Sequence, residues 1–267
     1  MTFRHALFAL PLCALVLMGA GCFGGGNSAS TGFDGGVFRT ADAGTKWDQL
    51  KILNLDTKLG SSADMGIVSV AFDPQDTQAV YVGTVENGVM YSLNGGQSWN
   101  LARGLSKGQV NSISVDPKDT CSVYAARGNQ IHKTVNCGRE WKEIYPHPRP
   151  DVLITSVVVD WYNNRTVYAA TSQGDVLRSD DMGGSWRAVY RIENVRINSI
   201  AIDPFDSRTL YVATQGSGIV KTTDSGATWT QMYKQLQELQ YARSPRIVVL
   251  DPTVKDRLYQ ISKYGIL

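Results

Sequence analysis

The stretch Gly218–Trp229, GIVKTTDSGATW, decides the fold of this chain. Its last eight residues follow the template Ser/Thr, x, Asp, x, Gly, x, Ser/Thr, Trp. Five windows match it fully or with one or two exchanges, and we number them template turns 1 to 5: Thr40–Trp47 (TADAGTKW), Ser92–Trp99 (SLNGGQSW), Thr134–Trp141 (TVNCGREW), Ser179–Trp186 (SDDMGGSW) and Thr222–Trp229 (TTDSGATW). Their tryptophans are 52, 42, 45 and 43 residues apart, which is typical of repeats that each form one four-stranded unit.

Each position of the template has a physical role. The carboxylate or amide oxygen at the third position accepts hydrogen bonds from nearby backbone N–H groups and closes a tight turn. A nearby glycine supplies positive φ, and the tryptophan buries a large surface between repeats. The structural residues are predicted to be Asp42, Trp47, Asn94, Trp99, Asn136, Trp141, Asp181, Trp186, Asp224 and Trp229, with the glycines Gly44, Gly96, Gly138, Gly184 and Gly226.

A second signature accompanies these turns. Alternating apolar runs end in Asp-Pro, or in Asp-Trp in one repeat, and a tyrosine follows eight residues after the aspartate. The alternation and the β-branched content of the runs are typical of strands. The aspartates are Asp73, Asp116, Asp160, Asp203 and Asp251, and the tyrosines are Tyr81, Tyr124, Tyr168, Tyr211 and Tyr259.

One repeat therefore contains an inner strand, a second strand, a third strand and an outer strand. Antiparallel four-stranded units arranged about an axis form a β-propeller. Gly35–Arg39 matches a third strand, whereas Arg246–Asp251 and Arg257–Ser262 match a first and a second strand. We therefore predict an all-β propeller of five blades, the last closed by N- and C-terminal strands. Because Gly265–Leu267 repeats the start of a third strand, a fragment of a seven-bladed propeller is the alternative.

The repeats resemble the Asp-box, or BNR-type, repeat over about residues 31–267. The strings DPxxxxxxYVAT and GIVKTTDSGATW are most similar to those of the photosystem II assembly factor family and its bacterial lipoprotein relatives. Sortilin-like and xyloglucanase-like propellers share the repeat. The resemblance implies the fold but leaves the function open, because the repeated residues are scaffold. The photosystem family implies an assembly role, although nothing in the chain indicates a photosynthetic host.

The first 31 residues have the composition of a targeting segment and a tether. Arg4 and His5 precede the apolar stretch Ala6–Met18, which is too short for a membrane span. Residues 19–22, Gly-Ala-Gly-Cys, resemble a bacterial lipobox with glycine in place of the usual leucine. We predict a signal peptide over 1–21, lipid attachment at Cys22, a Gly/Ser tether over 22–31 and the propeller over 32–267. Ordinary secretion is the alternative.

Two cysteines remain in the predicted propeller. Folding the hairpin about Arg127–Asn129 brings Cys121 opposite residues 135–137, which include Cys137. An extracytoplasmic location permits a disulfide. A Cys121–Cys137 disulfide and a pair of buried thiols are the two alternatives.

We find no recognisable catalytic or metal-binding pattern. Pro245–Val248 is a poor match to the Phe-Arg-Ile-Pro motif of sialidases. The carboxylates of the template turns should lie around one rim, not opposed across a cleft as glycoside hydrolysis requires. The chain has no Cys-x-x-Cys, phosphate loop or nucleophile elbow. We therefore expect no enzyme activity, no cofactor and no metal.

The loops of the expected propeller differ in charge between its two faces. The first and third turns of each blade share one face, where aspartates cap the turns. The opposite loops have a basic excess mixed with acids, which predicts an acidic partner; solvated loops without a partner are the alternative. The residues of this expected partner face are Arg103, Arg127, Arg191, Arg196 and Arg243.

These observations define a functional hypothesis. The net charge of +2 gives no reason to expect nucleic-acid binding. We interpret the chain as a monomeric propeller, lipid-anchored and extracytoplasmic in a bacterial cell envelope. It would bind another protein, such as a membrane protein with acidic segments, as a scaffold or assembly factor. A carbohydrate-binding or glycoside-hydrolase-like propeller is the alternative, and a fragment without its own function is a third reading.

Overall fold

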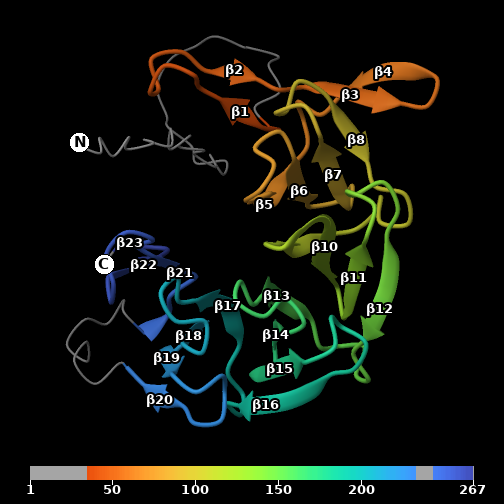
Figure 1. Cartoon of the computed structure of the whole chain (residues 1–267). Coiled ribbons are helices and arrows are strands. Elements are labelled where there is room, and N and C mark those ends of the chain that lie inside the picture. Colours follow the sequence, from red (N-terminus) through yellow and green to blue (C-terminus); the bar gives the residue numbers. More distant parts are fainter. Residues whose placement is uncertain (1–34, 233–242, 267) are drawn as a thin grey trace, which may run out of the picture.

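The structure is a computed structural model that describes residues 35–232 and 243–266. The predicted signal peptide, the lipid site Cys22 and the tether lie outside the described residues. Within them the chain forms an all-β propeller of five blades, built from small antiparallel sheets that are mostly four-stranded (Figure 1). This confirms the predicted fold class. The described part contains no helix that is long and apolar enough to cross a membrane.

Four blades repeat the predicted meander, with neighbouring strands in sequence order. Blade 1 contains β5 (Ile67–Phe72), β6 (Val80–Thr84), β7 (Val89–Ser92) and β8 (Trp99–Leu101). Blade 2 contains β9 (Val110–Asp116), β10 (Asp119–Arg127), β11 (Gln130–Thr134) and β12 (Lys142–Pro146). Blade 3 contains β13 (Ile154–Val159), β14 (Val167–Thr171), β15 (Asp175–Ser179) and β16 (Arg187–Arg191). Blade 4 contains β17 (Ile197–Ile202), β18 (Leu210–Thr214), β19 (Gly218–Thr222) and β20 (Thr230–Gln231).

The blades follow one another along an arc, and the first strands of successive blades lie next to one another on its inner side (Figure 1). Serine side chains on these strands bond to the backbone of the next blade. The Val157 N–H donates to Ser112 Oγ at 3.1 Å, and the Ile200 N–H donates to Ser156 Oγ at 3.2 Å. The polar residues of the alternating first-strand pattern therefore join the blades.

The second strands are buried on both faces. β6, β14 and β18 have no exposed residue, because each lies in the middle of its own sheet with packed side chains on either side. This environment explains why these runs are apolar throughout instead of alternating.

The aspartates before the second strands cap the intervening turns. Asp203 Oδ1 accepts the N–H groups of Phe205 at 2.8 Å and Asp206 at 3.2 Å. Asp160, which lacks the following proline, makes the same bonds to Tyr162 and Asn163. The carboxylate therefore forms this turn with or without proline.

An additional hairpin precedes blade 1. β3 (Ile52–Leu55) and β4 (Lys58–Ser61) pair with each other, and β3 pairs in parallel with β8. The first interval between template tryptophans is 52 residues, against 42 to 45 for the others. The hairpin accounts for this longer interval, and sequence reasoning did not predict it.

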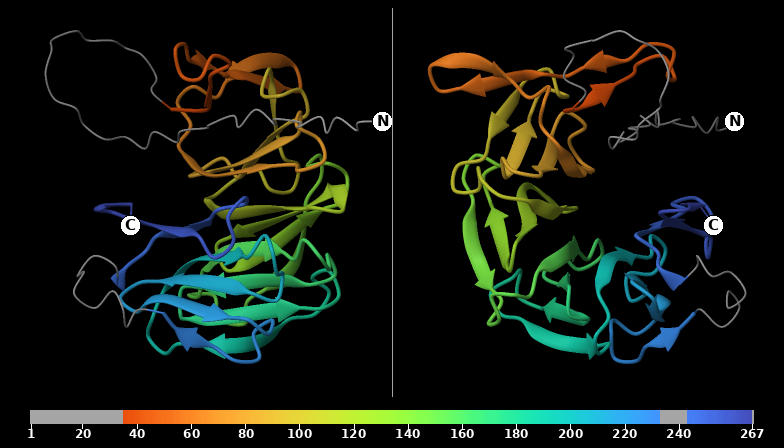
Figure 2. Two further views of the ribbon diagram at one scale, coloured as in Figure 1. Left: turned by 60° about the vertical axis from the view of Figure 1, so that its left-hand side comes forward. Right: turned by 180° about the vertical axis from the view of Figure 1, so that it is seen from behind.

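The predicted closure of the last blade is wrong. β1 (Phe38–Arg39) pairs with β2 (Asp48–Gln49), whereas β21 (Ile247–Leu250), β22 (Leu258–Ser262) and β23 (Gly265–Ile266) form a separate sheet. β23 takes the third-strand position expected for residues 35–39. A hairpin of adjacent segments costs less loop-closure entropy than pairing with a distant segment. The two terminal sheets lie at opposite ends of the arc (Figure 2).

Candidate binding site

The template turns are held by short-range hydrogen bonds. Asp224 Oδ1 accepts the Thr222 hydroxyl at 2.7 Å and the Thr228 N–H at 2.8 Å, and Thr222 Oγ1 accepts the Gly226 N–H at 3.0 Å. Asn94 and Asn136 accept the equivalent bonds through Oδ1. An oxygen acceptor is sufficient for this turn, which explains why asparagine replaces aspartate in two repeats.

Two consecutive left-handed residues complete each turn. In template turn 4 they are Met182 (φ 62°) and Gly183 (φ 93°). Gly183 therefore has the role that we predicted for Gly184, whose φ is not positive. Sequence reasoning also missed the first left-handed position, which four of the five turns fill with a residue other than glycine: Ala43, Cys137, Met182 and Ser225.

The template tryptophans pack against the preceding blade to different extents. Trp141 is 3% exposed and packs with Tyr81 and Tyr91 of blade 1. Trp186 and Trp229 are partly buried in the equivalent places. Trp47 is 39% exposed. The burial of the tryptophan therefore differs between turns, because it depends on which side chains of the neighbouring blade lie against it.

The carboxylates of template turns 4 and 5 are stabilised in the ionised form. Hydrogen bonds from Ser185 and Ser179 lower the pKa of Asp181 to about 2, and those from Thr228 and Thr222 lower the pKa of Asp224 to about 2. An unfolded aspartate titrates near about 3.9. Because the pKa is lower in the folded state, the ionised carboxylate stabilises the fold at pH values above the unfolded-state pKa. This stabilisation is lost as the pH falls from about 4 to about 2.

We therefore expect the Asp181→Asn/Asp224→Asn variant to lose less stability than the wild type on acidification. The amide should fit, because Asn94 Nδ2 donates to Ser98 Oγ at 3.0 Å in turn 2. Thermal midpoints measured between about pH 5 and pH 2 test this, and the difference between the proteins should appear below about pH 4. Parallel midpoint curves would contradict the assignment.

The arginines of the expected partner face lie in different environments. Arg191 pairs with the nearly fully buried Asp175, which Arg149 also approaches at 3.8 Å. Arg127 Nη1 donates to Gln130 Oε1 at 3.5 Å. The remaining three are the half-buried Arg196 and the exposed Arg103 and Arg243. Arg191 is therefore committed to its own blade, and the five do not form one equivalent set.

Arg103, which we expected on the face opposite the template turns, is bonded through its backbone to template turn 3 of the next blade. Its N–H donates to the Arg139 carbonyl at 3.2 Å, and its own carbonyl accepts the Trp141 N–H at 2.8 Å. These bonds join the loop after β8 to template turn 3 of blade 2. The outer edge of blade 1 thus extends onto blade 2.

A cavity of about 600 Å³ lies at this junction. It is bounded by the β3–β4 hairpin, the end of blade 1 and template turn 3. Its lining is Asn54, Leu55, Asp56, Tyr91, Asn100, Leu101, Ala102, Arg103, Ser106, Asn136, Arg139 and Glu140. Segments far apart in the sequence therefore share one polar site.

The cavity contains charges of both signs. Arg139 Nη1 donates to the Asn136 carbonyl at 2.9 Å, and a guanidinium has further N–H donors in a planar fork. Arg103 and Arg139 together could bind a carboxylate, while Asp56 and Glu140 supply acids from two different elements. Of these four charged residues, sequence reasoning singled out Arg103 and missed Asp56, Arg139 and Glu140. The pair Arg139-Glu140 was a usable signal, because the other template turns have no Arg-Glu there.

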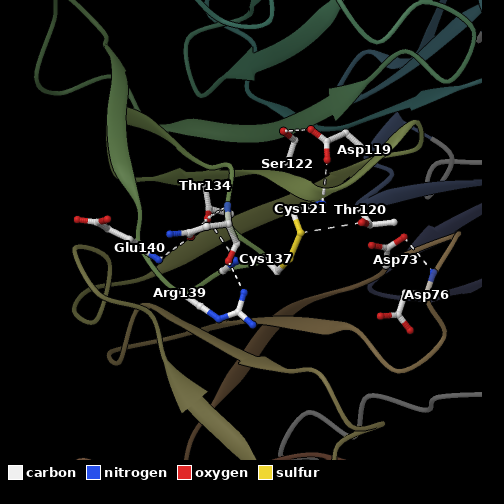
Figure 3. The surroundings of a disulfide bond; sticks show 12 residues. Asp73, Asp76, Asp119, Thr120, Cys121, Ser122, Thr134, Cys137, Arg139 and Glu140 are labelled. Carbon is white, nitrogen blue, oxygen red and sulfur yellow. Dashed lines mark hydrogen bonds between the residues drawn. A yellow bond between two sulfur atoms is a disulfide. The ribbon is translucent and has the colours of Figure 1, made fainter.

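A disulfide fixes one wall of this cavity. Cys121 on β10 is bonded to Cys137 in template turn 3, and the Cys137 N–H donates to the Cys121 carbonyl at 3.1 Å (Figure 3). In turns 4 and 5 a hydroxyl at the seventh position donates to the aspartate. Turn 3 has Glu140 there instead, so the disulfide supplies a constraint that its side chains do not.

His132 belongs to the interior of blade 2. Burial, with the nearby charge of Arg127, lowers the pKa of His132 to about 4, so the ring is neutral at neutral pH. Within residues 35–232 and 243–266, no three histidine, cysteine, aspartate or glutamate side chains are grouped as metal ligands.

No protein-family model matches the chain. The curated oligoxyloglucan-reducing end-specific xyloglucanase of Emericella nidulans is 26% identical over 122 residues, which are 43% of this chain and 14% of that protein. The solved structure of a Niastella koreensis GH74 enzyme aligns with a TM-score of 0.63 and 20% identity, over 85% of this chain and 38% of that chain. YCF48 from Cyanidioschyzon merolae aligns with a TM-score of 0.59 and 14% identity, over 87% of this chain and 75% of that chain.

These similarities establish the propeller fold. This chain spans 14% of the curated xyloglucanase and 38% of the Niastella koreensis enzyme, so the activities of those whole proteins do not transfer to it. One fold hosts many functions, and the choice among them depends on the site.

Proposed function

We propose that this protein is a lipid-anchored, extracytoplasmic β-propeller that binds an acidic segment of another protein, as a scaffold or assembly factor at a membrane surface. The observation that carries the proposal is the cavity between blades 1 and 2, which Arg103 and Arg139 line from two different blades. Arginine recognises carboxylates through paired N–H donors. The polar lining of asparagines suits backbone amides of a bound peptide.

The location rests on two further observations. The Cys121–Cys137 disulfide is of the kind that persists in oxidising compartments. The string at residues 19–22 resembles a lipobox, and a lipid on Cys22 would hold the propeller at a membrane without a spanning helix.

The cavity arginines are expected to control partner binding. An Arg103→Glu/Arg139→Glu variant should bind an acidic model peptide, poly-glutamate, at least about ten-fold more weakly, because attraction becomes repulsion across the site. Fluorescence anisotropy with labelled peptide measures this, and the wild-type affinity should fall with added salt. Arg165→Glu reverses an exposed arginine outside the cavity and is the matched control. Equal affinities of wild type and double variant would refute the cavity as the binding site.

The lipid anchor has its own test. Expressed in a bacterial host, the Cys22→Ser variant should move from the membrane fraction to the soluble fraction, because it has no sulfur for acylation. Fractionation followed by immunoblotting measures the shift, with Cys121→Ser as the cysteine control that should stay with the membrane. Membrane retention of the Cys22→Ser variant would remove the anchor from the proposal.

A carbohydrate-directed function is the second candidate, and one observation favours it. Asp56 on the β3–β4 turn and Glu140 on template turn 3 line the same cavity, and glycoside hydrolysis uses two carboxyl groups flanking one bond. Under this function, xyloglucan oligosaccharides are cleaved, and an Asp56→Asn/Glu140→Gln variant loses the cleavage. If the wild type binds the acidic peptide and does not cleave xyloglucan oligosaccharides, the scaffold function is supported and the carbohydrate-directed function is rejected.

A further inference from the structure

The junctions between blades use one repeated contact. At the junctions of blade 2 with blade 3 and of blade 3 with blade 4, the second-strand tyrosine is fully buried and reaches the template turn of the next blade. Tyr124 donates from its hydroxyl to the Met182 carbonyl at 3.0 Å, and Tyr168 donates to the Ser225 carbonyl at 3.4 Å. Met182 and Ser225 occupy the same position of turns 4 and 5. A second-strand tyrosine and a template turn are therefore the two halves of this interface.

The last sheet exposes one half of this interface. Tyr259 is 42% exposed, although its four counterparts are buried. Strand pairing places Tyr259 opposite Val249, and Ile261 opposite both Ile247 and Ile266, so these side chains share one side of the sheet. We call this the terminal face: Ile247, Val249, Tyr259, Ile261 and Ile266. Ile247 is 49% and Ile266 is 69% exposed. A contiguous apolar surface that is exposed to solvent marks an interaction site.

Template turn 1, Thr40–Trp47, is the other half, and it is also exposed. It is already in the bound conformation. Asp42 Oδ1 accepts the Thr40 hydroxyl at 2.8 Å and the Lys46 N–H at 2.9 Å, and Trp47 Nε1 donates to the Gly44 carbonyl at 3.1 Å. Ala43 has a left-handed φ of 55°, close to the 62° of Met182 and the 59° of Ser225.

Template turn 1 is attached to blade 1, and the sheet that carries the terminal face is attached to blade 4. The Leu50 carbonyl behind turn 1 accepts Trp99 Nε1 at 2.8 Å, and Gly36 bonds to Met65 at 2.8 Å, which fixes the β1–β2 hairpin next to blade 1. The Pro245 carbonyl at the start of the last sheet accepts Asn198 Nδ2 at 2.8 Å. These bonds hold turn 1 to blade 1 and the last sheet to blade 4, and a second copy can present turn 1 to the terminal face with all of them intact.

We propose that the terminal face of one copy binds template turn 1 of a second copy. Tyr259 packs against the second copy's Gly44, and its hydroxyl donates to the second copy's Ala43 carbonyl, as Tyr124 does to Met182. The contact continues the interface that already joins blades 2, 3 and 4. Because the two halves differ, the association is head-to-tail, and two copies that exchange both contacts form a closed dimer.

Sedimentation velocity of the full chain over a range of concentrations tests the proposal. Wild-type protein is expected to self-associate. Tyr259→Ser and Trp47→Ala should each weaken the association constant by about ten-fold or more. Tyr162→Ser removes an exposed tyrosine from a different surface and should leave it unchanged. A wild type that stays monomeric, or the same association constant in all four proteins, would overturn the proposal.

Cross-linking separates contact between copies from contact within one chain. An equimolar mixture of the Ala43→Cys and Tyr259→Cys variants should form a covalent dimer on oxidation that the wild type does not form. The mixture can link these positions only between copies. If it stays unlinked while the Ala43→Cys/Tyr259→Cys double variant becomes an internally linked monomer, the two surfaces meet within one chain and the proposal is wrong.

Discussion

The Trp141→Ala variant is expected to lose about 3–5 kcal/mol of unfolding free energy. Trp141 is 3% exposed, packs with Tyr81 and Tyr91 of the preceding blade, and donates from Nε1 to the Gly138 carbonyl at 3.0 Å. Truncation removes apolar contact from both blades and leaves a cavity that the rigid strands around it fill poorly. Urea unfolding at neutral pH, followed by tryptophan fluorescence and circular dichroism, measures the loss.

Trp47→Ala is the matched control, because it changes the same position of another template turn. Trp47 is 39% exposed, so at dilute concentration its removal should cost less than about half as much. The comparison separates the motif from its surroundings. Equal losses at Trp47 and Trp141 would mean that the tryptophan stabilises its own turn and not the junction between blades.

Reduction of the Cys121–Cys137 disulfide is expected to cost about 3 kcal/mol, because the bond closes a loop with a sequence separation of 16. Template turn 3 should be the first part to loosen, since Cys137 lies in it and Glu140 provides no hydroxyl at the seventh position. The measurement is the urea midpoint with and without reductant. Binding of the acidic peptide should weaken in parallel, because Asn136 and Arg139 of this turn line the cavity.

The Cys121→Ser/Cys137→Ser variant controls for other effects of the reductant. Its midpoint should equal that of the reduced wild type and should not change on addition of reductant. A wild-type midpoint that is insensitive to reductant under conditions that cleave the bond would show that turn 3 is held by its hydrogen bonds alone.

The sequence by itself determined the repeating unit. The side-chain bonds that close each template turn span at most four residues, such as Thr228 N–H to Asp224, so the residue pattern was sufficient to predict the turn. The apolar runs that end in aspartate likewise predicted the first and second strands, since strand alternation and turn capping are local properties. The all-β propeller followed from these units, although the fifth blade is the sheet β21–β23 and not the predicted composite of N- and C-terminal strands.

Tertiary structure alone decided how the units meet. Arg103, Arg139 and Asn54 come from three elements that no local pattern connects, and only the packing of blade 2 against blade 1 gathers them around one cavity. Trp47 and Trp141 occupy the same motif position but differ in burial, because burial depends on what lies opposite. The sheet at β21–β23 paired with itself, since a nearby segment reaches a strand edge at lower entropic cost than a distant one. Local interactions specified each blade, whereas contacts between residues far apart in the chain created the candidate site.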